Sequence, residues 1–359
     1  MALQFFDGFD DYGSYNTAIT SLYLYSALYA QYGGFATTGG AFSGTAIGGN
    51  DSGVVGGGYI QLPGPLSSPT NSVIVGARAY YTGATGYTCA NVYLDNFGRI
   101  MTKVQFTQVN GYTTVSAVNY AGTTLGSSST FILQPNTWIY FESLVTMGTT
   151  NGSVTALING QTVLTLNNVN TQSTLGNVVY YAGINYGFNG TYTYVDDMYV
   201  CDTTGPAPYN TFLTAVAGSM GPRVLTLFPS ANESVQWTPK TGTNYSEVNN
   251  STFQGDSSYV YSSVPGNTDL YNVSNVSSAT INEVLAVQTT LVSREDNAGT
   301  VNVAGLIQSG GNIYQGNTLP LTVNYQKVVN LYTNDPDTGS TWNPSKFFTG
   351  NVSIGVRQV

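Results

Sequence analysis

The sequence has 359 residues and few charges, with 9 Lys and Arg, 18 Asp and Glu and no His, so its formal net charge is −9. Charged residues make up 8% of the chain, against roughly 25% in an average globular protein. A phosphate-binding surface needs clustered basic residues and none is visible, so we expect no nucleic-acid partner. No apolar run approaches the roughly 18 to 20 residues that span a bilayer, so we expect no membrane segment.

Composition and length together predict an all-β protein of two domains. Gly, Asn, Ser, Thr and Tyr are abundant, which is typical of sheets joined by tight turns. A domain usually takes roughly 100 to 200 residues, so a chain of this length holds two. Residues 205–222 contain three prolines and no charge, which indicates a linker between domains at 1–204 and 223–359. The linker also carries apolar side chains, so we expect much of it to be docked on a domain surface: Phe212, Leu213, Val216 and Met220.

The first expected strand covers residues 3–12, and a region rich in Tyr and Gly follows at 13–58. In that region four tyrosines crowd around leucines with almost no charge nearby: Tyr23, Tyr25, Tyr29 and Tyr32. One interpretation is packing inside the first domain. The other is a protein interface, because aromatic enrichment with charge depletion is typical of buried contacts. We take these four tyrosines as interface candidates.

Residues 138–166 carry the clearest strand pattern in the sequence, a meander of three strands. Trp138–Met147 alternates between two faces, and Asn-Gly pairs at 151–152 and 159–160 mark the two turns. Shorter strands are expected on either side of the meander: several within 59–131, then 178–184 and 192–201. Strands at this spacing are typical of a β-sandwich.

The second domain shows strand patterns of the same kind. Residues 281–294 alternate, a turn follows, and 301–308 is expected to return as the partner strand. Ser309-Gly310-Gly311-Asn312 marks another hairpin. Two further strands are expected at 323–333 and 351–359. The pattern predicts a second β-sandwich.

Several motifs of the first domain carry a family resemblance. They are Phe6-Asp7-Gly8-Phe9-Asp10-Asp11-Tyr12, Tyr59-Ile60-Gln61-Leu62-Pro63, Ser72-Val73-Ile74-Val75-Gly76, Trp138-Ile139-Tyr140-Phe141-Glu142, Ile158-Asn159-Gly160-Gln161 and Val195-Asp196-Asp197-Met198-Tyr199-Val200-Cys201-Asp202. With these motifs, residues 1–204 resemble the concanavalin A-like, laminin-G-type jelly rolls found in bacteriophage virion proteins. The resemblance implies a jelly-roll fold in the first domain.

The same resemblance implies a structural protein on the exterior of a virion, either a head decoration or a tail component. Its partners would then be other virion proteins, and the low charge favours a homo-oligomer. The alternative function is a carbohydrate-binding module used in host adsorption, in which aromatic rings stack on sugar faces. The N-terminus shows no signal peptide, so we expect synthesis in the host cytoplasm.

Catalytic patterns are scarce. The sequence has no histidine, which removes the commonest general base and the usual zinc ligand. Glycoside hydrolases need two carboxyl groups across the scissile bond, and Glu142 is the only acid in its strand. The sequence therefore predicts a protein that is not an enzyme.

Two acid pairs are candidates for a metal site, Asp10-Asp11 and Asp196-Asp197. In jelly rolls of this family the first and last strands lie side by side, so the resemblance implies that four carboxylates converge and hold calcium. The alternative is that these aspartates cap turns and face solvent. Apart from calcium we expect no cofactor. Cys89 and Cys201 are expected to be free and buried, with a disulfide as the alternative.

Overall fold

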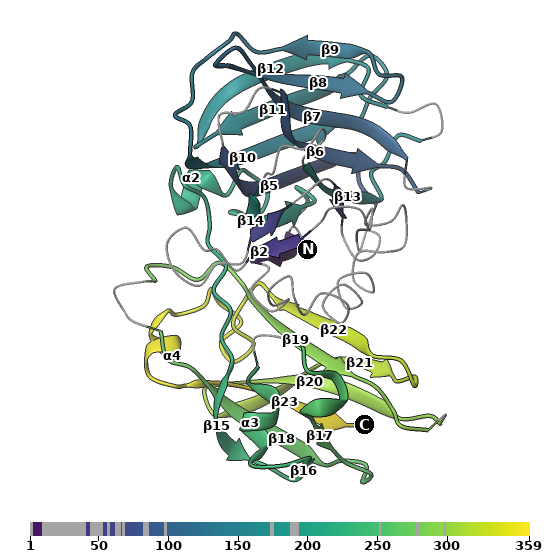
Figure 1. Cartoon of the computed structure of the whole chain (residues 1–359), viewed down its shortest axis with the longest axis vertical. Coiled ribbons are helices and arrows are strands. Elements are labelled where there is room, and N and C mark those ends of the chain that lie inside the picture. Colours follow the sequence, from purple (N-terminus) through teal and green to yellow (C-terminus); the bar gives the residue numbers. More distant parts are fainter. Residues whose placement is uncertain are drawn as a thin grey trace. The chain divides into compact units, whose positions relative to one another are not determined.

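A computed structural model describes the following parts of the chain: residues 3–8, 41–43, 53–55, 58–61, 66, 69–81, 86–96, 99–172, 176–186, 194–250, 253–276, 281–297 and 299–359. The described residues fall into two compact units, one ending at Leu225 and the other beginning at Thr226 (Figure 1). Nearly all regular structure in both is β, so the predicted all-β fold of two sandwiches is confirmed. Among the described residues, every helix is too short or too polar to cross a bilayer.

The first unit is built from two antiparallel sheets. In one sheet the strand order is β12-β11-β10-β5-β14-β3-β2, with β1 also pairing β14, and in the other it is β4-β13-β6-β7-β8-β9. The strand bounds are β1 Leu3–Asp7, β2 Ala41–Ser43, β3 Gly53–Val55, β4 Gly58–Gln61, β5 Ser72–Tyr81, β6 Gly86–Leu94, β7 Ile100–Val109, β8 Tyr112–Asn119, β9 Thr124–Ser127, β10 Thr137–Thr146, β11 Gly152–Ile158, β12 Gln161–Val169, β13 Tyr181–Tyr186 and β14 Tyr194–Cys201.

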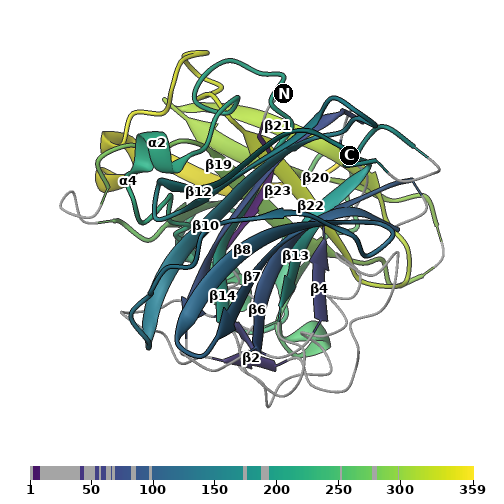
Figure 2. The same ribbon diagram turned by 90° about the horizontal axis from the view of Figure 1, so that it is seen from above.

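The two sheets pack face to face (Figure 2). The core between them is mostly apolar. Phe106 on β7 faces Phe141 on β10, with ring centroids 6.4 Å apart. A few polar side chains cross the core and make hydrogen bonds there. The Tyr93 hydroxyl on β6 lies 2.7 Å from the carbonyl oxygen of Ser143 on β10, and Asn91 Nδ2 donates to Val75 O at 2.9 Å. These bonds fix the register of one sheet over the other.

The predicted meander is confirmed as β10, β11 and β12. Asn159 and Gly160 have φ values of 50° and 73°, the left-handed pair that a tight two-residue hairpin requires. The third strand is longer than expected and reaches Val169. The first and last strands of the unit lie side by side, with Phe6 opposite Tyr199, as the family resemblance implies. Cys89 and Cys201 are both buried and free, as expected.

Residues 205–222 lie within the first unit, against the outer face of β10, β5 and β14. Leu213 is buried beside α2 (Thr214–Ala217), and the Arg78 Nη2 on β5 donates to Met220 O at 3.2 Å. Gly221 has a φ of 69° and lies so close to the Tyr140 ring that a Cβ would overlap it. This segment therefore covers the second face of β10, which explains why both faces of that strand are buried.

The second unit has a main sheet of order β15-β18-β23-β20-β21 and two short ladders, β19-β22 and β16-β17. Its elements are β15 Pro229–Ser234, β16 Thr238–Pro239, α3 Asn244–Val248, the 3-10 turn η3 Gly255–Ser257, β17 Val260–Tyr261, β18 Thr268–Val273, β19 Val287–Ser293, β20 Asn302–Ser309, β21 Asn312–Pro320, β22 Gln326–Tyr332, α4 Ser345–Phe348 and β23 Val352–Gln358. The β19-β22 ladder packs on the main sheet, because Asn330 on β22 lies directly over Gly305 and Gly316.

One predicted strand pairing is wrong. Residues 281–294 were expected to pair with 301–308, but β19 begins only at Val287 and pairs β22, while β20 lies between β21 and β23. The connection after Ser293 crosses from one layer to the other, with Glu295 N donating to Thr322 O at 2.9 Å. A turn signal in sequence is the same for a hairpin and for a crossing between layers. The hairpin at Gly310-Gly311 is confirmed, with φ values of 61° and 83°.

Candidate functional site

Several residues proposed from sequence lie outside the described residues. They are Asp10 and Asp11 of the calcium prediction and the four interface candidates Tyr23, Tyr25, Tyr29 and Tyr32. The protein interface at the four tyrosines therefore stays a prediction. Of the four aspartates of the calcium prediction, only Asp196 and Asp197 have a described position.

Asp196 and Asp197 lie at an irregular step in β14, and both are buried. Asp197 Oδ2 is 3.3 Å from Arg78 Nη1, and its Oδ1 accepts a hydrogen bond from Val224 N at 2.7 Å. The Asp197 N–H in turn donates to Asp196 Oδ1 at 2.8 Å. These acids do cap backbone amides, but the expectation that they face solvent is wrong.

The described half of the acid set is a poor fit for calcium. Asp197 already neutralises a guanidinium, and a metal would have to displace that cation. Across the described parts of the chain, no group of three or more acids or cysteines is placed to hold a metal ion. The four-carboxylate calcium site stays a prediction, because it depends on Asp10 and Asp11.

Glu142 is the centre of a closed polar cluster on the outer face of β10. Its carboxylate accepts hydrogen bonds from the Tyr199 hydroxyl, the Thr214 hydroxyl and, at 3.2 Å, the Thr214 N–H. Burial raises the pKa of the Glu142 carboxyl above its usual range, although hydrogen bonds from Thr214 and Tyr199 oppose the shift. The 213–214 backbone covers the carboxylate, so this acid serves to hold the segment after β14 and presents no face to a ligand.

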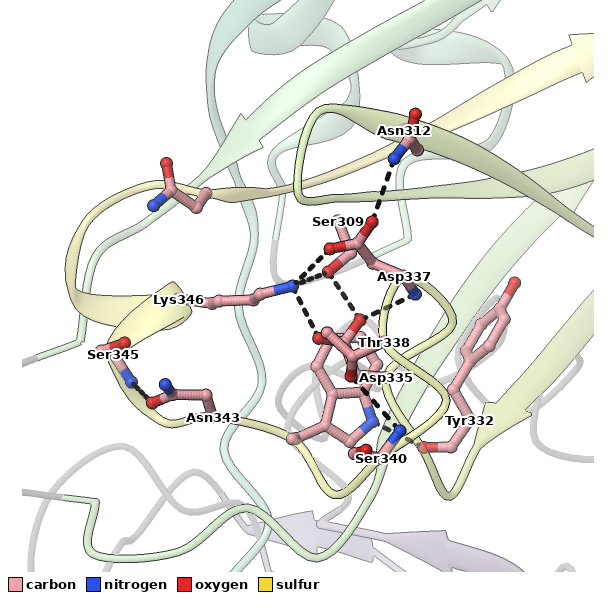
Figure 3. A network of polar contacts seen from close by, with 12 residues as sticks. Ser309, Asn312, Tyr332, Asp335, Asp337, Thr338, Ser340, Asn343, Ser345 and Lys346 are labelled. Atoms are coloured by element: carbon pink, nitrogen blue, oxygen red, sulfur yellow. Dashed lines mark hydrogen bonds and ion pairs between the residues drawn. The ribbon is translucent and has the colours of Figure 1, made fainter.

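A second polar cluster joins the end of β20 to α4 in the second unit (Figure 3). Lys346 Nζ lies 2.6 Å from Asp335 Oδ2, 2.8 Å from Ser309 Oγ and 3.2 Å from Asp337 Oδ2. The Ser309 hydroxyl donates to Asp335 Oδ1 at 2.7 Å. A serine beside a lysine is an arrangement that some hydrolases use as nucleophile and base.

The charges in this cluster oppose such a role. Burial alone would lower the pKa of Lys346, but hydrogen bonds and charge from Asp335 and Asp337 outweigh it and raise that pKa above its usual range. The ammonium therefore stays protonated and cannot accept the Ser309 proton. The cluster is an ion-paired brace that holds the 335–346 loop against the sheet.

A shallow hollow of about 550 Å³ lies at one end of the first unit. Four separate segments line it: the turn before β5, the β10–β11 loop, the residue that follows Thr171, and the approach to β13. The lining residues are Pro69, Thr70, Asn71, Met147, Gly148, Thr149, Asn151, Gln172, Asn177 and Val178. None of them is charged.

The β10–β11 wall of the hollow is held in place by buried Thr171. Its hydroxyl donates to Thr146 O at 2.8 Å and accepts from Gly148 N at 3.0 Å. Its own N–H donates to Gly148 O at 3.0 Å. A Cβ on Gly152 would overlap this hydroxyl, so the loop closes only with glycine there. This wall of the hollow therefore has a fixed backbone.

Four side-chain amides of the lining give the hollow its chemistry: Asn71, Asn151, Gln172 and Asn177. Within the described residues, none of these amides makes a side-chain hydrogen bond, in contrast to Asn91 and Asn159, which are paired. Each amide offers two donors and an acceptor, which match a hydroxyl group in either direction. The site is not predictable from the sequence, because its residues come from four separate segments and the pattern of each predicts only a turn.

No protein family model matches the chain, and no curated protein matches it. Among solved structures, alginate lyase Aly36B is 10% identical, with a TM-score of 0.35, and the match covers 54% of this chain and 95% of that one. Domain 4 of AbnA, a GH43 extracellular arabinanase from Geobacillus stearothermophilus in complex with arabinotriose, is 18% identical over 45% of this chain and 75% of that one, with a TM-score of 0.32. Galectin LEC-6 from Caenorhabditis elegans is 13% identical over 40% and 89%, with a TM-score of 0.28. Likeness at this level assigns no activity or ligand.

These matches nevertheless correct one prediction. The sequence analysis expected no enzyme, and solved structures similar to this chain include alginate lyases. The missing histidine and the single acid in β10 exclude particular mechanisms, the serine triad and the carboxylate pair, and not catalysis as such.

Proposed function

We propose that the chain is a carbohydrate-binding protein whose first unit takes a neutral saccharide in the amide-lined hollow. The observation that carries the proposal is a set of four side-chain amides that line one uncharged cavity and make no side-chain hydrogen bond to any described residue. Sugar hydroxyls both donate and accept hydrogen bonds, as amides do. A cavity of about 550 Å³ also falls in the size range of small-ligand sites, roughly 300 to 1,000 Å³.

The charge of the site favours a neutral ligand. A carboxylate or phosphate on the ligand would find no cation in the lining, and the chain as a whole carries a net charge of −9. Each hydrogen bond that replaces one to water contributes about 1 kcal/mol, so four give binding on the order of millimolar. Weak binding of this kind becomes useful when several copies act together.

The test is a saccharide titration of the full chain, followed by ligand-observed NMR. The probes are glucose, galactose, mannose and N-acetylglucosamine with their disaccharides. We expect at least one probe to bind, and Asn71→Ala with Asn177→Ala to weaken the binding of that probe roughly thirtyfold. Gln161→Ala is the matched control, since Gln161 is an exposed amide at the opposite end of β12. The proposal would be overturned if no probe bound, or if the double variant bound the probe as tightly as the natural chain does.

A second proposal concerns where the protein works, on the exterior of a bacteriophage particle as a head decoration or tail component. Its support is the motif resemblance of residues 1–204, together with the pairing of β1 and β14 that the resemblance implies. A saccharide site would serve host adsorption there. Mass spectrometry of purified particles whose genome encodes this chain should detect it, in many copies for a head protein and few for a tail fibre. Absence from the particles would contradict the proposal.

A further inference from the structure

The second unit presents two tyrosines side by side, Tyr261 in β17 and Tyr259 just before that strand. Tyr259 and Tyr261 are 37% and 52% exposed, and as residues i and i+2 of an extended segment they share one face. Their ring centroids are 6.1 Å apart, with an angle of 57° between the planes. We call this pair the tyrosine platform.

The platform is held from behind by a buried acid. Glu247 on α3 accepts hydrogen bonds at Oε2 from the Ser258 hydroxyl at 2.8 Å and from the Tyr259 N–H at 3.2 Å. Its Oε1 accepts one from the Thr241 N–H at 2.8 Å. The Lys240 N–H completes the support by donating to Tyr259 O at 3.0 Å. Two exposed rings on a fixed backbone are pre-organised, so a ligand loses little free energy in ordering them.

The charges beside the platform are already satisfied. Lys240 Nζ donates to Asp256 O at 2.5 Å and lies 5.5 Å from the centroid of the Tyr259 ring. The Asp256 carboxylate pairs with Arg294 at 2.9 Å and accepts from the Tyr325 hydroxyl at 2.5 Å. The surface therefore offers rings and hydroxyls beside one ammonium, that of Lys240, which lies between a backbone carbonyl and the Tyr259 ring.

These features discriminate between classes of ligand. Aromatic rings also stack on nucleic-acid bases, but such sites need a basic groove, and among the described residues Lys240 alone places a cation over these rings. A protein partner usually buries about 800 Å² on each side, much more than two rings provide. A pyranose ring has an apolar C–H face that covers one aromatic ring and hydroxyls at its rim, so it matches a small, uncharged aromatic surface.

We propose that the tyrosine platform is a second carbohydrate-binding surface, which takes the ring faces of a neutral polysaccharide chain. It is independent of the amide-lined hollow, because the two lie on different units and use different chemistry: ring stacking here and hydrogen bonding there.

The test is a binding assay of the full chain on insoluble cellulose and chitin and on soluble xyloglucan in an affinity gel. We expect retention by at least one polymer, a roughly tenfold loss in Tyr259→Ala with Tyr261→Ala, and near-normal retention in Tyr261→Phe, which keeps the ring. Tyr112→Ala is the matched control, because Tyr112 on the first unit is 51% exposed. The single variant Tyr261→Ala replaces the double variant if the latter melts at a lower temperature.

The outcomes separate this inference from the proposed function. Retention that survives Asn71→Ala with Asn177→Ala but falls with the platform variants supports the platform alone. Retention by none of the three polymers, retention unchanged in the platform variants, or an equal loss in Tyr112→Ala overturns the platform, whatever the hollow binds.

Discussion

At the scale of single residues, Glu142 and Lys346 show two ways of placing charge inside a protein that has little of it. Glu142 is closed in by hydroxyls and a backbone N–H, and its pKa is raised chiefly by burial. Lys346 is closed in by two carboxylates that keep it protonated. Both hold a segment without regular strand structure against a sheet, so both are structural, although either could be taken for a catalytic group from sequence.

Glu142→Gln should change how stability depends on pH. The folded pKa of Glu142 lies above its unfolded value, so the stability it contributes is present below the ordinary Glu range and is lost as pH rises through the folded pKa. Glutamine does not titrate. We expect the melting temperature of the variant, relative to the natural chain, to rise between pH 4 and pH 8. A difference that stays constant across that range would show that Glu142 has an ordinary pKa.

Lys346→Met should leave the buried Asp335 carboxylate without its cation. Loss of one partner of a buried pair costs about 3 kcal/mol, which chemical denaturation can measure. The pKa of Asp335 is lowered in the fold, so its contribution is present above the ordinary Asp range and lost as pH falls. The difference in free energy of unfolding between the natural chain and the variant should therefore become smaller as the pH falls. Lys103→Met, a lysine in β7, is the control, and an equal loss there would contradict the role of the brace.

At the scale of elements, local turn chemistry predicts hairpins and cannot predict how layers pair. The Asn159-Gly160 turn and the Gly310-Gly311 turn both adopt the left-handed pair that their sequences require. The β19–β22 ladder instead depends on contacts between distant strands, such as Asn330 over Gly305, and no local signal encodes it. The hollow was missed for the same reason, because Asn71 and Asn177 meet only after the sheets have formed.

The Gly310-Gly311 turn offers a prediction with its control next to it. Both glycines have positive φ, so alanine is strained at either. A Cβ on Gly310 would also overlap the Asp337 carboxylate, whereas one on Gly311 would meet nothing within 4 Å. We expect Gly310→Ala to lower the free energy of unfolding by about 2 kcal/mol more than Gly311→Ala. Equal losses in denaturant titrations would mean that Asp337 does not pack on the turn.

At the scale of the whole molecule, the low charge favours self-association, because few like charges keep copies apart. The homo-oligomer remains a prediction whose proposed contacts lie outside the described residues. Light scattering after size exclusion should give a mass above 38.0 kDa for the natural chain. Tyr25→Ser with Tyr29→Ser should reduce that mass with an unchanged melting temperature if the tyrosines form an interface. A natural chain that stays monomeric at high concentration would contradict the prediction.

Saccharide binding at the hollow is tested most directly by the side-chain amide resonances of its own lining. The full chain, labelled with ¹⁵N, is titrated with the neutral saccharides, and its Asn and Gln side-chain signals are assigned through single substitutions. We expect the signals of Asn71, Asn151, Gln172 and Asn177 to move together along one binding curve, while that of Gln161 stays in place. If those four signals do not move with any saccharide, or if Gln161 moves as far as they do, the hollow is not a carbohydrate site.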